Sequence, residues 1–201
     1  MENIILRVVN KEKYIEILNN VPYRTVEDLA IIYAIDQELP FDSEEDLLLK
    51  GIVTTEMLRK LGLTEVQLHN VAVANSNRLH PAKYKDIFSL CNDIVEDWAE
   101  ITPPERSPEY VISNDTCSLG GAAVIFYSNV LDKLADLYDN DLFICPSSTN
   151  EVIAYNASEF DAEDLKEIVL NATQECVPDN LFLSDHVYRY DREEKKLSIA
   201  A

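Results

Sequence analysis

Glycine is scarce in this sequence, and its scarcity excludes two nucleotide-binding motifs. The chain has 4 glycines in 201 residues, whereas average composition would supply roughly 14. No G-x-G triplet occurs. The dinucleotide fingerprint and the Walker-type phosphate loop both need glycine where the backbone approaches phosphate closely. Neither is therefore present.

Basic residues are also few. The 37 Asp and Glu residues outnumber the 17 Lys and Arg residues, so the formal net charge is −20. A surface this acidic repels a phosphate backbone, which argues against direct binding of nucleic acid. The composition instead favours an acidic protein that acts by binding another molecule.

Long hydrophobic runs and paired cysteines are missing as well. The longest apolar runs, Leu29–Ile35 and Ala122–Tyr127, are far shorter than the ~20 residues of a membrane helix. The first residues lack the pattern of a signal peptide, so we expect a cytoplasmic protein with no membrane contact. The cysteines form no C-x-x-C pair, and we expect reduced side chains in the core, with no zinc site or disulfide: Cys91, Cys117, Cys145 and Cys176.

Catalytic motifs are absent too. The three histidines, His69, His80 and His186, form no H-E-x-x-H pattern, and we expect His69 to be a partly buried polar contact on a helix. Ser184-Asp185-His186 contains the residue types of a catalytic triad, but consecutive residues cannot adopt its geometry by themselves. No G-x-S-x-G elbow supports a hydrolase. We therefore predict no enzymatic activity, no metal site and no cofactor.

Hydrophobic spacing predicts the elements of the first half of the chain. It indicates a strand over Asn3–Val9, a helix over Lys11–Asn19, one long buried strand over Thr25–Ile35 and a loop over Gln37–Lys50. The start of the long strand, Val26-Glu27-Asp28-Leu29-Ala30, is equally compatible with the beginning of a helix. Thr54 is expected to cap a short helix that ends at Gly62. Thr64 and Gln67 form a capping box before a helix that runs to about Asn77, and a further amphipathic helix is expected near Tyr84–Trp98.

The second half alternates short strands with two capped helices. Strands are expected over Tyr110–Ser113, Ala122–Tyr127, Leu142–Cys145 and Val152–Tyr155, with a terminal hairpin of Val187–Tyr190 and Lys196–Ile199. Ser128 and Asp161 are the predicted helix caps. The second of these helices carries an apolar stripe of Leu165, Ile168, Val169, Ala172 and Cys176. The pattern predicts an α+β fold with mixed or antiparallel sheets.

Three prolines in residues 101–108 indicate a linker. It divides the chain into an N-terminal α+β and helical half, residues 1–100, and an acidic C-terminal α+β half, residues 109–201. Residues 52–61 and 124–134 resemble each other weakly, which leaves open two related halves.

The acidity is concentrated in the second half. Between Arg106 and Arg189 lie 15 acids and 2 bases, a net charge of −13. The charge is either a solubilising surface or a surface that attracts a basic partner, in which carboxylates imitate the spacing of phosphates. For the second alternative, the candidate partner-binding residues are Asp132, Asp136, Asp139, Glu159, Glu163 and Asp164.

Several segments together resemble an uncharacterised bacterial family of unknown function, common in gut Firmicutes and distantly similar to the YtpQ-like proteins. The matching segments are Val26–Tyr33, Leu61–Glu65 with Leu68-His69, Gly120–Ala123, Pro146–Ser148 with Glu151–Ile153, and Leu183–Asp191. The resemblance covers nearly the whole chain and supplies no catalytic residues. It implies cargo of phages and integrative elements, a setting in which small acidic proteins are often inhibitors of defence nucleases.

The leading hypothesis is therefore a non-enzymatic acidic binding protein. Its sharpest form is an anti-CRISPR-like inhibitor, encoded by a mobile element, of a CRISPR effector or another basic, nucleic-acid-handling host protein. The alternative is a housekeeping or small-molecule-binding α+β domain. In that alternative, a pocket is lined by Gly120-Gly121, Ser147-Ser148 and Ser184–His186.

Overall fold

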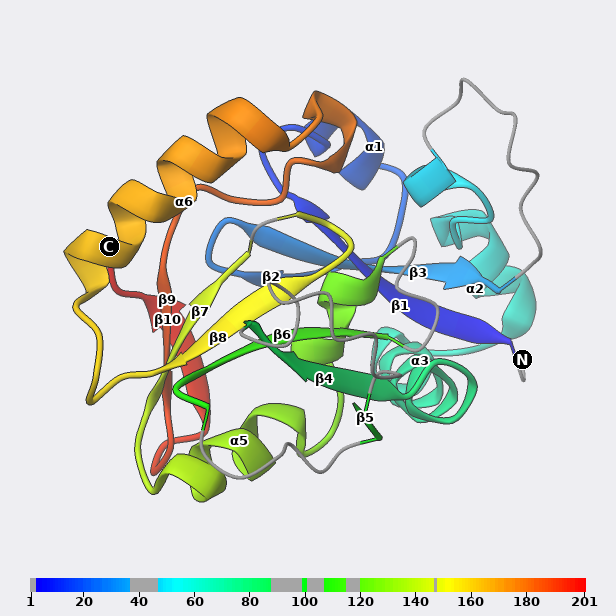
Figure 1. Cartoon of the computed structure of the whole chain (residues 1–201). Coiled ribbons are helices and arrows are strands. Elements are labelled where there is room, and N and C mark those ends of the chain that lie inside the picture. Colours follow the sequence, from blue (N-terminus) through cyan, green and yellow to red (C-terminus); the bar gives the residue numbers. More distant parts are fainter. Residues whose placement is uncertain (1–2, 37–46, 88–98, 101–106, 115–119, 147) are drawn as a thin grey trace.

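Two antiparallel sheets form the framework of the protein, as a computed structural model shows (Figure 1). It describes residues 3–36, 47–87, 99–100, 107–114, 120–146 and 148–201. The smaller sheet has the strand order β1-β3-β2, from β1 (Ile4–Asn10), β2 (Arg24–Val26) and β3 (Leu29–Ile35). The predicted α+β class is confirmed.

The larger sheet has seven strands in the order β10-β9-β7-β8-β6-β4-β5, and every pairing is antiparallel. Its strands are β4 (Ala82–Asp86), β5 (Ala99–Glu100), β6 (Glu109–Asn114), β7 (Leu142–Cys145), β8 (Val152–Asn156), β9 (Tyr188–Asp191) and β10 (Lys196–Ile199). The strands predicted in the second half near β6 to β10 are confirmed, including the terminal hairpin.

The larger sheet takes strands from both sides of the linker predicted at residues 101–108. Lys83 of β4 pairs with Ser113 of β6, and Tyr84 pairs with Ile112. One hydrophobic cluster also joins β1 and β3 to β6, β7 and β8. Residues 101–106 lie outside the described residues. The two halves of the sequence thus share a sheet and a core.

Helices lie around the sheets. They are α1 (Ile15–Leu18), α2 (Thr55–Leu61), α3 (Glu65–Leu79), α5 (Val130–Tyr138) and α6 (Ala162–Cys176), with 3₁₀ turns η1 (Leu47–Leu49), η2 (Gly121–Phe126) and η3 (Asp179–Leu181). Three predicted caps are confirmed. Thr54 accepts from the Met57 amide at 3.2 Å, Thr64 and Gln67 form the capping box, and Asp161 accepts from the Glu163 amide at 2.9 Å.

The predicted long strand over Thr25–Ile35 is wrong, because the segment is a hairpin. β2 and β3 pair through Val26 and Leu29, and the turn between them is Glu27-Asp28. Glu27 has a φ of 54°, in the left-handed region that glycine and asparagine prefer. The left-handed position of the turn is thus held by glutamate, a residue type that seldom adopts this conformation, and the apolar residues on either side of the turn look continuous in the sequence.

The predicted strand over Ala122–Tyr127 is also wrong. Residues Gly121–Phe126 form η2, whose first five residues are buried. A short apolar run has no periodicity that separates a buried strand from a buried helical turn. The following helix is α5, but Ser128 is not its cap. Asn129 holds that position in a left-handed conformation, with no side-chain cap bond.

Two further predicted helices differ from the structure. Ala82–Asp86 is strand β4, so the helix expected near Tyr84–Trp98 does not begin at Tyr84. Ile87 is helical, and residues 88–98 lie outside the described residues. The helix expected over Lys11–Asn19 is reduced to Ile15–Leu18. The predicted loop over Gln37–Lys50 lies largely outside the described residues, and its last part contains η1.

The cysteine prediction is confirmed at one described position and wrong at another. Cys145 is buried beside Leu165 and Val169, and burial raises the pKa of its thiol to about 12. Cys176 is exposed at the end of α6. The predicted apolar stripe on α6 is consequently shorter than expected. Only Leu165 and Val169 are buried in this helix, and Ile168 is 56% exposed. Cys91 and Cys117 lie outside the described residues.

Helix α3 covers the free edge of β1. The buried Ser76 hydroxyl accepts from the Leu6 amide at 2.8 Å, and the Asn75 side chain donates to the Ile4 carbonyl at 3.0 Å. Unpaired backbone groups at a sheet edge are a template for aggregation. The side chains of Ser76 and Asn75 thus provide hydrogen-bond partners for one N–H group and one C=O group of the β1 edge.

We expect Ser76→Ala to lower the free energy of unfolding by about 1–3 kcal/mol, because it leaves the buried Leu6 amide without its acceptor. Urea titration followed by circular dichroism measures the change. Ser128→Ala is the matched control, since Ser128 is exposed and should change stability by less than about 0.5 kcal/mol. Equal effects of the two substitutions would contradict the role of Ser76.

Candidate functional site

The six predicted partner-binding carboxylates fall into two separate groups. Asp132 and Asp136 lie on α5 and Asp139 follows it, next to the β9–β10 hairpin. Glu163 and Asp164 lie in the first turn of α6, and Glu159 precedes that helix. Helices α5 and α6 pack on opposite faces of the larger sheet, so the two groups lie on different surfaces (Figure 1).

The group on α5 is paired within the chain. Lys195 lies 3.0 Å from Asp132, Arg192 lies 3.0 Å from Asp136, and Arg192 also binds Asp139. The Tyr190 hydroxyl donates to Asp132 at 2.8 Å. Three of the predicted partner-binding residues therefore hold the terminal hairpin against α5.

The pKa shifts of the aspartates near α5 agree with these hydrogen bonds and ion pairs. Burial opposes ionisation of Asp132, but hydrogen bonds from Lys195 and Tyr190 prevail and hold its pKa below the ordinary value. Asp141 has a lowered pKa for the same kind of reason. Burial is again outweighed, here by hydrogen bonds from the Arg192 amide and the Arg189 side chain. These carboxylates stay charged because the protein itself supplies their cations.

The group at α6 differs because its carboxylates form no ion pairs among the described residues. Glu163 and Asp164 are exposed, and so is Glu167 one turn later. In the part of the chain that the structure describes, none of the three forms an ion pair. Glu159 instead accepts from the Asn156 side chain at 2.9 Å. Of the predicted residues, Glu163 and Asp164 are therefore the exposed ones whose carboxylates form no ion pair or side-chain hydrogen bond among the described residues.

Apolar surface accompanies these acids. Ile168 is 56% exposed on α6, one turn beyond Asp164. The opposite face of the helix packs Leu165 and Val169 against Cys145, Tyr155 and Val187. The helix is thus fixed to the larger sheet by one face, and its other face combines carboxylates with an exposed isoleucine.

A buried polar cluster joins two of the segments that carry the family resemblance. The Ser184 hydroxyl donates to Asp28 Oδ2 at 2.7 Å, and the Tyr188 hydroxyl donates to Asp28 Oδ1. Tyr188 Oη also lies 3.0 Å from Ser184 Oγ. Burial, then the hydrogen bond to Asp28, raise the pKa of Tyr188 above its ordinary value. We name Asp28, Ser184 and Tyr188 the latch, because they connect the β2–β3 turn to the segment before β9.

The latch is not arranged as a catalytic triad. Ser184 is 1% exposed, and His186 contacts its hydroxyl only through the backbone amide, at 3.1 Å. The His186 ring lies instead 3.1 Å from Lys166 Nζ and 3.2 Å from the Ala201 carbonyl. Ser184 therefore has no imidazole base beside it.

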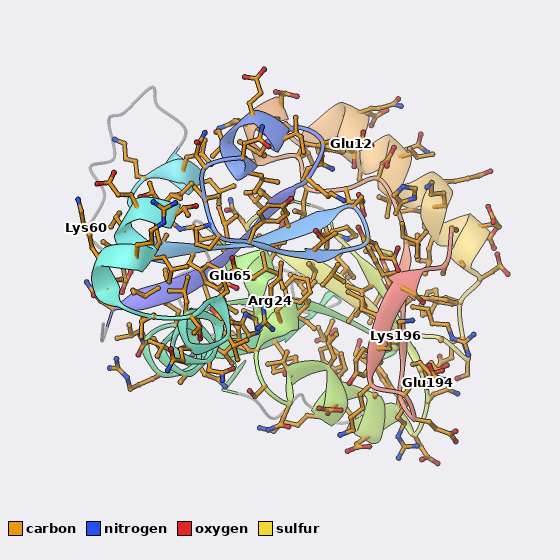
Figure 2. All side chains as sticks on the ribbon, turned by 180° about the vertical axis from the view of Figure 1, so that it is seen from behind. Glu12, Arg24, Lys60, Glu65, Glu194 and Lys196 are labelled. Atoms are coloured by element: carbon orange, nitrogen blue, oxygen red, sulfur yellow. The ribbon has the colours of Figure 1, made fainter. Side chains whose placement is uncertain are left out.

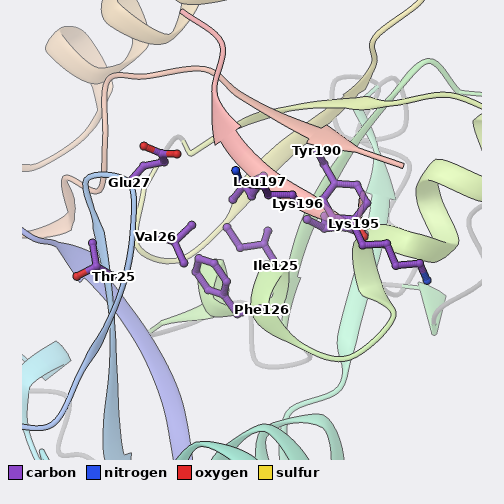
Figure 3. A pocket seen from close by; sticks show the side chains of 10 residues that line it. Thr25, Val26, Glu27, Ile125, Phe126, Tyr190, Lys195, Lys196 and Leu197 are labelled. Atoms are coloured by element: carbon purple, nitrogen blue, oxygen red, sulfur yellow. The ribbon is translucent and has the colours of Figure 1, made fainter. Parts of the chain in front are cut away.

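The residues predicted to line a pocket in the alternative function do not line the cavity described below. Gly121 packs against Asn150 and Ser113, and Ser148 is buried in the neighbouring loop. Ser147 lies outside the described residues. A pocket does open elsewhere, between the β2–β3 turn, η2 and the terminal hairpin (Figure 3). The sequence gives no signal for it, because its walls are far apart along the chain.

His69 is a partly buried polar contact, as predicted. Its Nδ1 atom lies 3.2 Å from the hydroxyl of Tyr33, and the two rings meet edge to face. Arg24 and Glu65, labelled in Figure 2, act electrostatically on the Tyr33 hydroxyl. Burial, followed by the charge of Arg24, lowers the pKa of His69 below its ordinary value of 6.5. His69 is therefore held neutral more firmly in the folded chain than in the unfolded one.

This lowered pKa predicts a loss of stability in acid. Below about pH 6.5 the unfolded chain binds a proton at His69 more readily than the folded chain does, so the free energy of unfolding falls as the pH decreases. We expect His69→Gln to remove that part of the fall, by less than about 1 kcal/mol because solvent screens the half-buried ring. Urea titrations at pH 5, 6 and 7 measure it. An unchanged acid dependence in the variant would contradict the assignment.

Metal and membrane features are also absent from the described part of the chain. No group of three or more His, Cys, Asp or Glu side chains there could hold a metal ion. No helix among the described residues has the length and hydrophobicity needed to cross a membrane.

The model of DUF5688, a family of unknown function, matches residues 1–192. No curated protein and no solved structure matches the chain significantly.

Proposed function

This chain belongs to the DUF5688 family of unknown function, and we propose that it is a non-enzymatic protein that binds a basic partner through the outward face of α6. We name this face the α6 face: Glu163, Asp164, Glu167 and Ile168. The observation that carries the proposal is the contrast between the two acidic groups. Carboxylates beside α5 form ion pairs with cations of the same chain, whereas those of the α6 face form none among the described residues.

Part of the acidity of α6 serves the helix itself. Acids in the first turn complement the positive end of the helix dipole, an effect of about 0.3–1 kcal/mol each. Glu163 and Asp164 occupy that turn, but Glu167 lies beyond it. Asp161 already caps the amides of the first turn. The acids are therefore more numerous than the helix end requires.

The α6 face also has the composition of a small interaction surface. Protein interfaces commonly place an apolar centre inside a polar rim. Ile168, 56% exposed, has the acids of the α6 face on the turns beside it. A partner that offers an apolar contact ringed by lysine or arginine would bury the isoleucine and pair the carboxylates.

The partner class that fits is a basic, nucleic-acid-handling protein, including a CRISPR effector. Such proteins bind phosphates with clustered lysine and arginine side chains. Carboxylates on one helix face would compete with phosphates for those same cations, without binding nucleic acid. In this proposal the protein inhibits its partner by occupying the nucleic-acid site.

The experiment is affinity capture of bacterial lysate proteins on the immobilised full chain, at about 50 mM and 500 mM salt. We expect basic proteins to be retained at low salt and released at high salt. The triple variant Glu163→Gln, Asp164→Asn and Glu167→Gln should bind a purified captured partner at least ~10-fold more weakly. Addition of DNA or RNA should displace the wild-type protein from that partner.

The matched control removes the same number of charges beside α5, with Asp132→Asn, Asp136→Asn and Asp139→Asn. These carboxylates already have cations within the chain, so the control variant should keep its affinity while its hairpin becomes less stable. Equal binding by the α6 variant and the wild type would overturn the proposal, as would retention that does not depend on salt.

A further inference from the structure

A cavity of about 440 Å³ opens between the β2–β3 turn and the β9–β10 hairpin, on a different part of the surface from the α6 face (Figure 3). Its size lies in the usual range for small-molecule sites. Apolar side chains form most of its wall, and they come from four separate elements: Val26, Ile125, Phe126, Leu131 and Leu197. A ligand there would place an apolar body among these side chains.

Two charges of opposite sign accompany this apolar wall. Glu27 contributes a carboxylate from the β2–β3 turn, and Lys196 contributes an ammonium from β10. Figure 3 shows the charged ends of both side chains on the same side of the pocket. In the chain as far as it is described, neither side chain forms an ion pair.

The other lysine of the pocket is already occupied. Lys195 points away from Glu27 in Figure 3 and binds Asp132 at 3.0 Å. Tyr190, which also lines the pocket, directs its hydroxyl to the same carboxylate at 2.8 Å. The charges left to meet a ligand are therefore Glu27 and Lys196, which together are neutral.

We propose that this pocket binds a small zwitterion with an apolar body, the chemistry of a hydrophobic α-amino acid. The ligand's ammonium pairs with Glu27, its carboxylate pairs with Lys196, and its side chain lies against Phe126 and its apolar neighbours. A purely anionic ligand would meet the repulsion of Glu27 and of a chain with net charge −20. A purely cationic ligand would meet the repulsion of Lys196.

The position of Glu27 is fixed by the latch. The next residue, Asp28, binds both Ser184 and Tyr188, so the turn that carries Glu27 is tied to the segment leading into the hairpin that carries Lys196. The turn that carries Glu27 and the hairpin that carries Lys196 are thus connected through the same hydrogen bonds of Asp28. A site whose charged groups are positioned before the ligand arrives loses less free energy on ordering.

Isothermal titration of the full chain with L-phenylalanine and L-leucine tests the site. 3-Phenylpropionate, which lacks the ammonium, and 2-phenylethylamine, which lacks the carboxylate, are the half-charged analogues of phenylalanine. We expect saturable binding of at least one amino acid. Both analogues should bind at least ~10-fold more weakly than phenylalanine, because each loses a charge-assisted hydrogen bond.

The variants Glu27→Gln and Lys196→Gln should each weaken amino-acid binding at least ~10-fold. Lys133→Gln is the control, since Lys133 is exposed on α5 outside the pocket, and it should leave binding unchanged. Thermal unfolding of all three variants checks that they are folded. The proposal is overturned if neither amino acid binds, if either analogue binds as tightly as phenylalanine, or if the two pocket variants bind like the control.

Discussion

Gly121→Ala is expected to destabilise the protein by about 3–5 kcal/mol or to prevent its folding. A Cβ atom at this position would lie 2.0 Å from the Asn150 carbonyl oxygen and 2.2 Å from Ser113 Oγ. The first of these is a backbone atom, so no side-chain rotation can relieve the clash. Ser113 also donates to the same carbonyl at 2.6 Å, so the added methyl group would separate β6 from the loop that leads into β8.

Gly62→Ala provides the comparison for this variant. Gly62 ends α2 with a φ of +67°, and a Cβ there would meet no atom within 4 Å. Its substitution should cost about 1 kcal/mol, the penalty for a left-handed alanine alone. Urea titration of both variants separates steric overlap from backbone preference. Similar losses at the two positions would contradict the close packing assigned to Gly121.

Asp28→Ala is expected to lower the free energy of unfolding by about 2–4 kcal/mol. The substitution removes the acceptor of two hydroxyl groups, those of Ser184 and Tyr188, and both residues are almost completely buried. The two hydroxyls can still bond to each other across 3.0 Å, so part of the loss is recovered. The rest of the expected loss in the free energy of unfolding is the cost of one buried hydroxyl group that no longer has an acceptor.

Asp185→Ala is the matched control, because Asp185 is a carboxylate in the same segment with half of its side chain exposed, 4.0 Å from His186. Its removal should change stability by less than about 1 kcal/mol. Hydrogen exchange should also show faster exchange of the β9 amides in Asp28→Ala than in Asp185→Ala. If the two variants unfolded at the same urea concentration, the latch would not be a stabilising element.

Local signals in the sequence predicted much of this fold. The caps at Thr54, Thr64 and Asp161 act within three residues of each helix start, so the neighbouring sequence contains the whole interaction. The terminal hairpin likewise depends on residues close together in the chain. These elements were predictable because their stabilising contacts are short-range.

The failures occur where the tertiary structure overrides a local pattern. Glu27 adopts a left-handed turn that its residue type does not favour, and the sequence therefore concealed the division between β2 and β3. Residues 121–126 are apolar because η2 is buried among β1, β6 and α5, and that burial would equally suit a strand. No local feature distinguishes the two.

The candidate site was predicted only in part, because the ion pairs that distinguish its two acidic groups join residues far apart in the sequence. The acid-rich interval between Arg106 and Arg189 excludes the cations that follow it in the sequence. Two of those cations, Arg192 and Lys195, pair with Asp136 and Asp132 in the structure. Sequence position cannot show that a hairpin returns to a helix more than fifty residues earlier. The exposed acids of α6 were identifiable, but their difference from those near α5 was not.

Because the ribosome synthesises the chain from its N-terminus, the residues of the terminal hairpin are added after those of α5. When residues up to about 180 have been made, α5 and its aspartates are present, but Arg189, Arg192 and Lys195 are not. At ≈ 5–20 residues per second, a nascent chain therefore carries uncompensated negative charge for about a second or more before its counterions emerge. The β2–β3 turn is synthesised still earlier, and the hydrogen bonds to its Asp28 form only after Ser184 and Tyr188 have been added. These parts of the fold are therefore completed only after residues 184–195 have been synthesised.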